Sequence, residues 1–237
     1  MKIAGLTLVA AALASVLIAQ TPSPQERAAA IKEAAAQNQA ALKQYSWMET
    51  TEISLKGEVK KKEQKQCYYG ADGKVQKTPV PGSEPSQPSQ QKGGRGRGGR
   101  LKQEIVEHKV EETKDYMEKV AALVHEYVPP DPQKIQAAQA AGGVSVQPSG
   151  ASGSVNIASY AKPGDLLSIG FDMAAKKMQS YKVNSYVEKP KEDDVTLSVT
   201  FGRLTDGTSY PQEVVLDVPA KNIRVKVTNS GYKKAGA

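Results

Sequence analysis

The chain has 237 residues, of which 39% are hydrophobic and 24% are charged, and its formal net charge is +7. This length suits one large domain or two small ones, and the mean hydropathy of −0.49 indicates a soluble, rather polar protein. The single cysteine, Cys67, excludes an intramolecular disulfide, so stability must come from packing.

Residues 1–19 have the pattern of a secretory signal peptide. Lys2 gives the start a positive charge, an apolar run of roughly 17 residues follows it, and polar residues begin at Gln20. The run ends in the small residue Ala19 and no cysteine follows it, so a lipid-modified lipoprotein is not indicated. We expect cleavage near Ala19 and export to the periplasm or the extracellular space of a bacterium. An uncleaved membrane anchor is the alternative.

The first expected element after the signal is a helix over residues 24–43. Ser23 is suited to cap it, Pro24 fits the first helical position, and Glu26 completes a capping box. Apolar residues and alanines recur at intervals of three and four, which predicts a helix that packs by one face only. They are Ile31, Ala35, Leu42 and Tyr45.

Three antiparallel strands should follow. Residues 46–55 alternate between apolar and polar, as in a half-buried strand, with Trp47 and Ile53 on the same side. Turn sequences at 56–57 and 71–73 then predict strands over 58–69 and 74–80. The strand over 58–69 is rich in lysine and glutamine, which suits an edge where lysines discourage association.

Residues 81–100 contain Pro, Ser, Gln, Gly and Arg but no aliphatic side chain, which predicts a disordered loop. Its basic cluster, with Arg95, Arg97 and Arg100, is a candidate anion-binding site because flexible arginines bind phosphates bidentately. No aromatic residue is interleaved for base stacking and export removes the usual partners, so nucleic acid is disfavoured. The favoured partner is an anionic membrane surface, and a merely soluble loop is the alternative.

The next segment carries the clearest helical pattern of the chain. Apolar residues recur at four and three over residues 101–127, and Pro129-Pro130 ends the pattern. Asp131-Pro132 then begins a shorter helix to residue 141, which Gly142-Gly143 ends. After it, turn residues separate alternating segments, of which 194–202 is the clearest, and the chain should have about ten strands in all.

Strands and helices that are each apolar on one side need to cover one another. We therefore expect an α+β fold: one curved, mainly antiparallel sheet of about ten strands, a half-barrel whose concave face is covered by helices. Residues 20–237 would form this single domain, with 81–100 as an insertion. In the alternative, residues 144–237 fold back on themselves as a sandwich of about seven strands.

Three local motifs resemble the periplasmic lipoprotein-carrier fold of the LolA and LolB type. They are Tyr45-Ser46-Trp47 after the first helix, the Lys56-Gly57-Glu58 hairpin, and the segment from Tyr69 to Lys74 that enters the third strand. Proteins with that fold hold acyl chains between a half-open barrel and its helical lid. The resemblance thus implies a lipid or lipoprotein as the partner. The Gly/Arg-rich insertion and the polar carboxyl-terminal part depart from the family pattern.

Candidate catalytic residues and metal ligands are few. Glu104, His108 and Glu111 share one helical face but have no fourth ligand, and His125 is too distant to join them, which favours surface ion pairs over a metal site. Cys67 has no nearby histidine to serve as its base, and no serine lies in a nucleophile elbow. We expect neither an enzyme nor a bound cofactor or metal.

The leading hypothesis is an exported, non-enzymatic binding protein that encloses an apolar ligand such as a lipid or lipoprotein acyl chain. The alternative is a structural or adhesive cell-envelope protein with a sandwich-like carboxyl-terminal half and a solid core. A hydrolase whose site assembles from distant Asp and Tyr residues is a third reading. The expected ligand-binding residues are Trp47, Met117, Val120, Val124, Phe171 and Phe201.

Overall fold

The computed structural model describes residues 33, 36–80, 99–128, 130–172 and 177–234. Within the helix that begins at residue 99, side chains are described from residue 111 onward. The chain divides into two units, residues 1–37 and 38–237. Residues 33 and 36–42 are helical, as the sequence predicts, whereas the signal peptide and most of the expected first helix lie outside the described residues.

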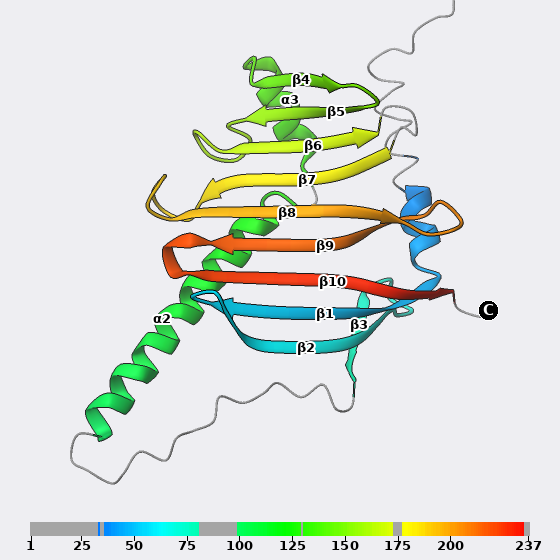
Figure 1. Cartoon of the computed structure of the whole chain (residues 1–237). Coiled ribbons are helices and arrows are strands. Elements are labelled where there is room, and N and C mark those ends of the chain that lie inside the picture. The colour runs from blue at the N-terminus through cyan, green and yellow to red at the C-terminus, as the bar shows by residue number, and fades with distance from the viewer. Residues whose placement is uncertain (1–32, 34–35, 81–98, 129, 173–176, 235–237) are drawn as a thin grey trace, which may run out of the picture. The chain divides into compact units, whose positions relative to one another are not determined.

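Ten strands form one open antiparallel sheet, in the order β3-β2-β1-β10-β9-β8-β7-β6-β5-β4. This confirms an α+β fold with an antiparallel sheet of the expected size (Figure 1). The strands are β1 Tyr45–Leu55, β2 Glu58–Tyr69, β3 Val75–Pro79, β4 Val144–Ser149, β5 Ser152–Ala158, β6 Leu166–Asp172, β7 Lys177–Tyr186, β8 Asp194–Arg203, β9 Ser209–Val218 and β10 Ile223–Lys234.

The sandwich alternative is wrong. Strands β4 to β10 each pair with their neighbours in sequence, and β10 then pairs with β1, so residues 144–234 continue one sheet. The physical reason is that the apolar face of these strands packs against helices, and no second sheet is needed to cover it.

Besides the helical residues 33 and 36–42, the described part of the chain has two longer helices and one short turn of 3-10 helix: α2 Gly99–His125, α3 Pro132–Ala140 and η1 Pro219–Lys221. The Asp131 side chain caps α3 by accepting a hydrogen bond of 2.8 Å from the Gln133 backbone N–H. Because α2 begins at Gly99, the expected loop over 81–100 is wrong for its last two residues, and 81–98 lie outside the described residues. No helix in the described ranges is both long and apolar enough to cross a membrane.

The strand register explains how the apolar face is built. Residues directly opposite each other on neighbouring strands share a face. One such row is apolar from β4 to β1 and consists of Val144, Ile157, Leu167, Val183, Leu197, Leu216, Val225 and Ile53. The next row on this face stays apolar as far as Val227 of β10, then continues as Thr51 and Glu63.

Helix α2 packs on this apolar face. Val120 is fully buried and Leu123 is 6% exposed, in one core with Val218 and Ile223 of the sheet. Burial of each such side chain contributes roughly 1.5–3 kcal/mol. The stripe predicted over residues 101–127 is confirmed for Met117, Val120, Val124 and Tyr127, and Leu123, which the predicted spacing did not include, is buried with them.

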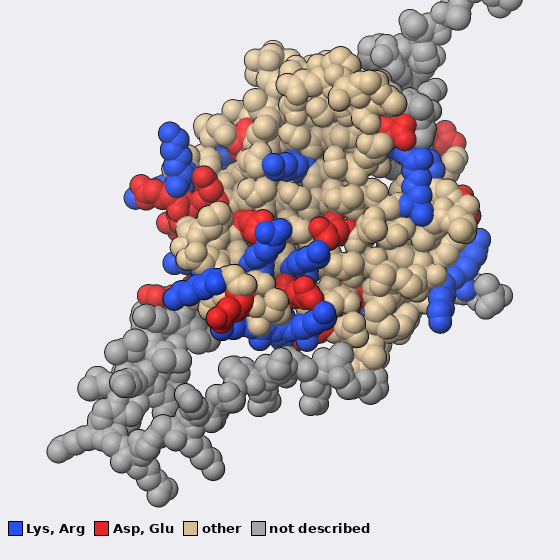
Figure 2. All heavy atoms as spheres, viewed as in Figure 1, with Lys and Arg blue, Asp and Glu red and all other residues tan. Residues whose placement is uncertain are grey.

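The opposite face of the sheet is polar. Its rows carry serine, asparagine and charged residues, and Glu52 lies between Lys62, at 2.7 Å, and Lys226. Acidic and basic side chains alternate over the strands on this face in Figure 2. Such alternation suits a solvated surface, whereas the carboxyl-terminal half of α2 packs against the apolar face.

Candidate functional site

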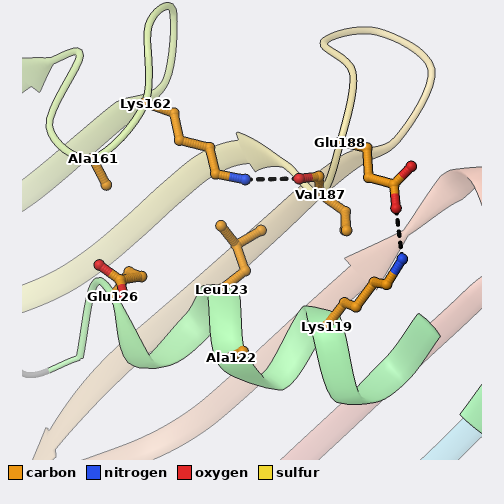
Figure 3. A pocket seen from close by; sticks show the side chains of 8 residues that line it. All are labelled: Lys119, Ala122, Leu123, Glu126, Ala161, Lys162, Val187 and Glu188. Atoms are coloured by element: carbon orange, nitrogen blue, oxygen red, sulfur yellow. Dashed lines mark hydrogen bonds and ion pairs between the residues drawn. The ribbon is translucent and has the colours of Figure 1, made fainter. Parts of the chain in front are cut away.

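An open pocket of about 410 Å³ lies beside the carboxyl-terminal half of α2. Its other walls are the loop between β5 and β6 and the loop that follows β7 (Figure 3). The lining residues are Lys119, Ala122, Leu123, Glu126, Ala161, Lys162, Val187 and Glu188.

The floor of the pocket is apolar and opens directly onto the core. Leu123 lines the pocket and is also a member of the buried core, and Val187, which lines it too, is partly buried against that core. In Figure 3 the Leu123 side chain points from α2 into the space between the two loops. A guest in the pocket would therefore contact the edge of the hydrophobic core.

The rim of the pocket carries ion pairs. Lys119 Nζ lies 2.6 Å from Glu188 Oε1, and Lys134 Nζ lies 2.5 Å from Glu126 Oε2. These pairs lower the pKa values of Glu188 and Glu126 below that of an ordinary carboxyl, since each carboxylate accepts a hydrogen bond from a lysine. The lining itself contains two lysines and two glutamates, so its net charge does not favour an anion or a cation.

Lys162 connects the two loops. Its Nζ donates hydrogen bonds to the backbone oxygens of Tyr186, at 2.9 Å, and Val187, at 2.7 Å. The ammonium group also lies 5.1 Å from the centre of the Tyr186 ring. The role of Lys162 is thus to fix the pocket wall.

A buried hydrogen-bond network anchors the end of α2 beside the pocket. The Tyr127 hydroxyl donates to Asp165 Oδ2 at 2.6 Å and lies 2.7 Å from Ser185 Oγ. Tyr181 donates its hydroxyl to the Tyr127 backbone oxygen. Burial and the Asp165 carboxylate raise the pKa of Tyr127 far above that of an ordinary phenol, so it remains protonated and able to donate.

Asp165 also organises the loop after β5. Its carboxylate accepts hydrogen bonds from the backbone N–H groups of Tyr160, Ala161 and Lys162, at 2.6, 2.9 and 2.7 Å. It is 2% exposed, and Tyr127 and Ser185 are buried as well. Although serine, tyrosine and aspartate meet here, their polar atoms bond to one another and to backbone in the interior. The network therefore holds the structure together and does not present a reactive group.

The expected ligand-binding residues divide between two places. Val120 is fully buried in the core, where Met117, Val124, Phe171 and Phe201 pack against it while partly exposed. Trp47 lies elsewhere, stacked on Tyr232 with ring centres 5.6 Å apart. The predicted set is thus not a single site, and Val120 is inaccessible to a guest while α2 is in place.

The remaining candidates contribute little to the pocket. Arg95 and Arg97 lie outside the described residues, and Arg100 lies in the first turn of α2. Cys67 is fully buried, and burial raises the pKa of its thiol, which disfavours the thiolate form. Within the described ranges, no three His, Cys, Asp or Glu side chains gather as a metal site would require.

Sequence reasoning missed the residues that shape the pocket. Lys162 and Asp165 stand in the Lys-Pro-Gly-Asp segment, which was recognisable only as a turn. Tyr127 was placed on the apolar stripe of its helix, but its hydroxyl needs a buried partner, and the aspartate of that turn supplies it. Val187 was expected to continue the alternation of Tyr181 and Val183, but β7 ends at Tyr186, and Glu188 was not singled out by the sequence. In comparisons with known proteins, the chain matches no family model, no curated protein and no solved structure.

Proposed function

We propose that this protein is an exported, non-enzymatic binding protein that holds an apolar ligand, such as a lipid or lipoprotein acyl chain. In this proposal the sheet is curved, helices close its concave face, and the ligand enters between α2 and the loops beside it. The observation that carries the proposal is a pocket whose floor, at Leu123, belongs to the hydrophobic core.

The dimensions and chemistry of the pocket support an apolar guest. Its volume of about 410 Å³ falls within the roughly 300–1,000 Å³ of small-molecule sites. Burial of apolar surface against Leu123 and Val187 would stabilise a bound chain by about 25 cal/mol per Å². The four charged lining residues sit in ion pairs or hydrogen bonds to backbone, which leaves the apolar floor as the main attraction.

The test combines extraction with a designed obstruction. Lipids in an organic extract of the natively purified full chain are identified by mass spectrometry, and binding of cis-parinaric acid is followed by fluorescence. Ala122 is exposed on α2 and lines the pocket, whereas Ala121 is exposed next to it but lies outside the lining. We expect Ala122→Trp to weaken binding at least about tenfold by filling the pocket, and Ala121→Trp to leave it unchanged.

Two results would overturn the proposal: no lipid in the extract together with no fatty-acid binding, or equal binding by both tryptophan variants. They would favour a structural or adhesive envelope protein with a solid core. The full burial of Val120 and the 1% exposure of Tyr127 are the observations that support this second candidate. This second candidate no longer includes a sandwich-like carboxyl-terminal half, because residues 144–234 continue one sheet.

A further inference from the structure

A second cluster of functional groups lies at the amino-terminal end of β1, whereas Ile53 lies near the carboxyl-terminal end of that strand. The rings of Trp47, Tyr69, Tyr210 and Tyr232, here named the tyrosine cluster, pack on one another. Tyr232 is at its centre, with ring centres 5.6 Å from Trp47 and 4.3 Å from Tyr210. Asn229 fixes the tryptophan by accepting a hydrogen bond of 3.1 Å from its indole N–H.

The strand pairing explains why the rings gather here. β10 pairs with β9 only as far as Thr228 and Glu213, and both β1–β10 and β8–β9 have register shifts at this end. The ribbons of β9 and β10 diverge toward the carboxyl terminus in Figure 1. Aromatic rings fill the place where backbone pairing stops, which accounts for the rings but not for their hydroxyl groups.

Three hydroxyl groups of the tyrosine cluster make no hydrogen bond to the described residues. In the described part of the chain, Tyr69, Tyr210 and Tyr232 make ring contacts but their hydroxyls have no hydrogen-bond partner. These oxygens reach solvent, because the one buried side-chain polar atom without a partner in the described residues belongs to Tyr116. By contrast, Tyr45 in the same region donates to Asp206 Oδ2 at 2.7 Å. Half-buried phenols without partners are available to a ligand.

A neutral ion pair lies next to these phenols. Lys77 Nζ lies 2.7 Å from both oxygens of Glu49, and Glu49 faces the same side of β1 as Trp47. The strand register places the pair beside the rings, because Cys67 of β2 lies opposite both Trp47 of β1 and Lys77 of β3. The pair offers both an acceptor and a donor without net charge.

The chemistry of the cluster excludes several ligand classes. The Glu49–Lys77 pair has no net charge, so it favours neither an anion nor a cation. Ring centres only 4.3–5.6 Å apart leave no cage between them for a quaternary ammonium group. What fits is a neutral molecule with many hydroxyl groups and one apolar face, which stacks on an outer ring and hydrogen-bonds to phenols and to the Glu49–Lys77 pair. We infer that the tyrosine cluster is a binding site for a neutral saccharide.

Trp47 provides the test, because it is the one tryptophan of the chain and lies within the cluster. The full chain is titrated with cellulose-, starch- and N-acetylglucosamine-derived oligosaccharides while its tryptophan emission and binding heat are measured. We expect at least one series to bind and to shift the emission. Tyr210→Phe and Tyr232→Phe keep the rings but remove one hydroxyl each, so each should weaken binding about five- to tenfold.

Tyr68→Phe is the matched control. Tyr68 is 45% exposed and neighbours Tyr69 on β2, but successive strand residues face opposite sides, so its loss should leave binding unchanged. The thermal midpoint of each variant checks that the fold is retained. The inference is overturned if no oligosaccharide binds, or if the Tyr210 and Tyr232 variants bind as tightly as the Tyr68 variant. Ala122→Trp should leave saccharide binding intact, which separates this site from the proposed lipid pocket.

Discussion

The two ends of the α2-facing side of the sheet are built differently. From β4 to β10 its rows are apolar and pack against α2 and α3, whereas over β1 and β2 the same rows end in Lys61, Glu63 and Lys65. There, Glu63 lies 2.5 Å from Lys61 and 3.2 Å from Lys65. Hydrophobic burial therefore stabilises one end of the continuous sheet, whereas ion pairs and ring packing stabilise the other end. Its parts should respond differently to mutation and to pH.

The largest effect is expected from Leu123→Ala, which removes a buried side chain from the apolar end. We expect the free energy of unfolding to fall by about 2–5 kcal/mol, as for other large-to-small core changes. Urea denaturation followed by circular dichroism measures it. Ile53→Ala is the comparison, since Ile53 continues the same apolar face but is partly exposed at the boundary. An equal loss for both variants would mean that the two ends share one core.

A smaller effect is expected from Tyr127→Phe, which deprives Asp165 and Ser185 of a buried partner. The free energy of unfolding should fall by about 1–3 kcal/mol, because a buried polar group then loses its hydrogen bond. Tyr116→Phe, within α2 itself, is the matched control. Its hydroxyl has no partner, so removing it should leave stability unchanged or slightly increased. Equal losses would show that ring packing, not the hydroxyl network, anchors α2.

The smallest effect concerns pH and, among the strands, should be largest at the ion-paired end. Hydrogen bonds from Lys61 and Lys65 lower the pKa of Glu63, and Lys62 likewise lowers that of Glu52, from an ordinary value of 4.5. A depressed pKa in the folded state means that the stabilisation is complete above pH 4.5 and is lost as the pH falls through the folded-state value. We expect amide hydrogen exchange in β1 and β2 to accelerate below pH 4.5 before exchange in β6 to β8. Uniform acceleration, or none in β1, would contradict the comparison.

The helices and strands could be predicted from the sequence because the spacing of apolar residues within a segment indicates both its secondary structure and its buried side. Alternation in 194–202 and the three-four spacing of 101–127 each specify which side of an element is apolar; the first is confirmed, and the second is confirmed from Met117 onward. The choice between one sheet and a sandwich depended instead on the pairing of β1 with β10, whose residues are far apart in the chain. No local pattern contains that information.

The candidate site was harder to predict for the same reason. The alternating pattern placed Trp47 on the correct face of the sheet. It did not indicate that Trp47 lies too far along β1 to belong to the core around α2. Lys162 and Glu188 take their roles from loops that meet only in the folded chain. Tyr127 and Asp165 form the one case in which composition held a clue, because a tyrosine on an apolar stripe requires a buried partner.

An open sheet leaves two outermost strands, β3 and β4, and each contains a proline, Pro79 and Pro148. A proline has no backbone N–H to offer to an incoming strand, and Lys77 adds charge to the β3 side. Copies of the chain are thereby discouraged from joining rim to rim into fibrils. A sheet that does not close on itself needs such protection at both of its outermost strands.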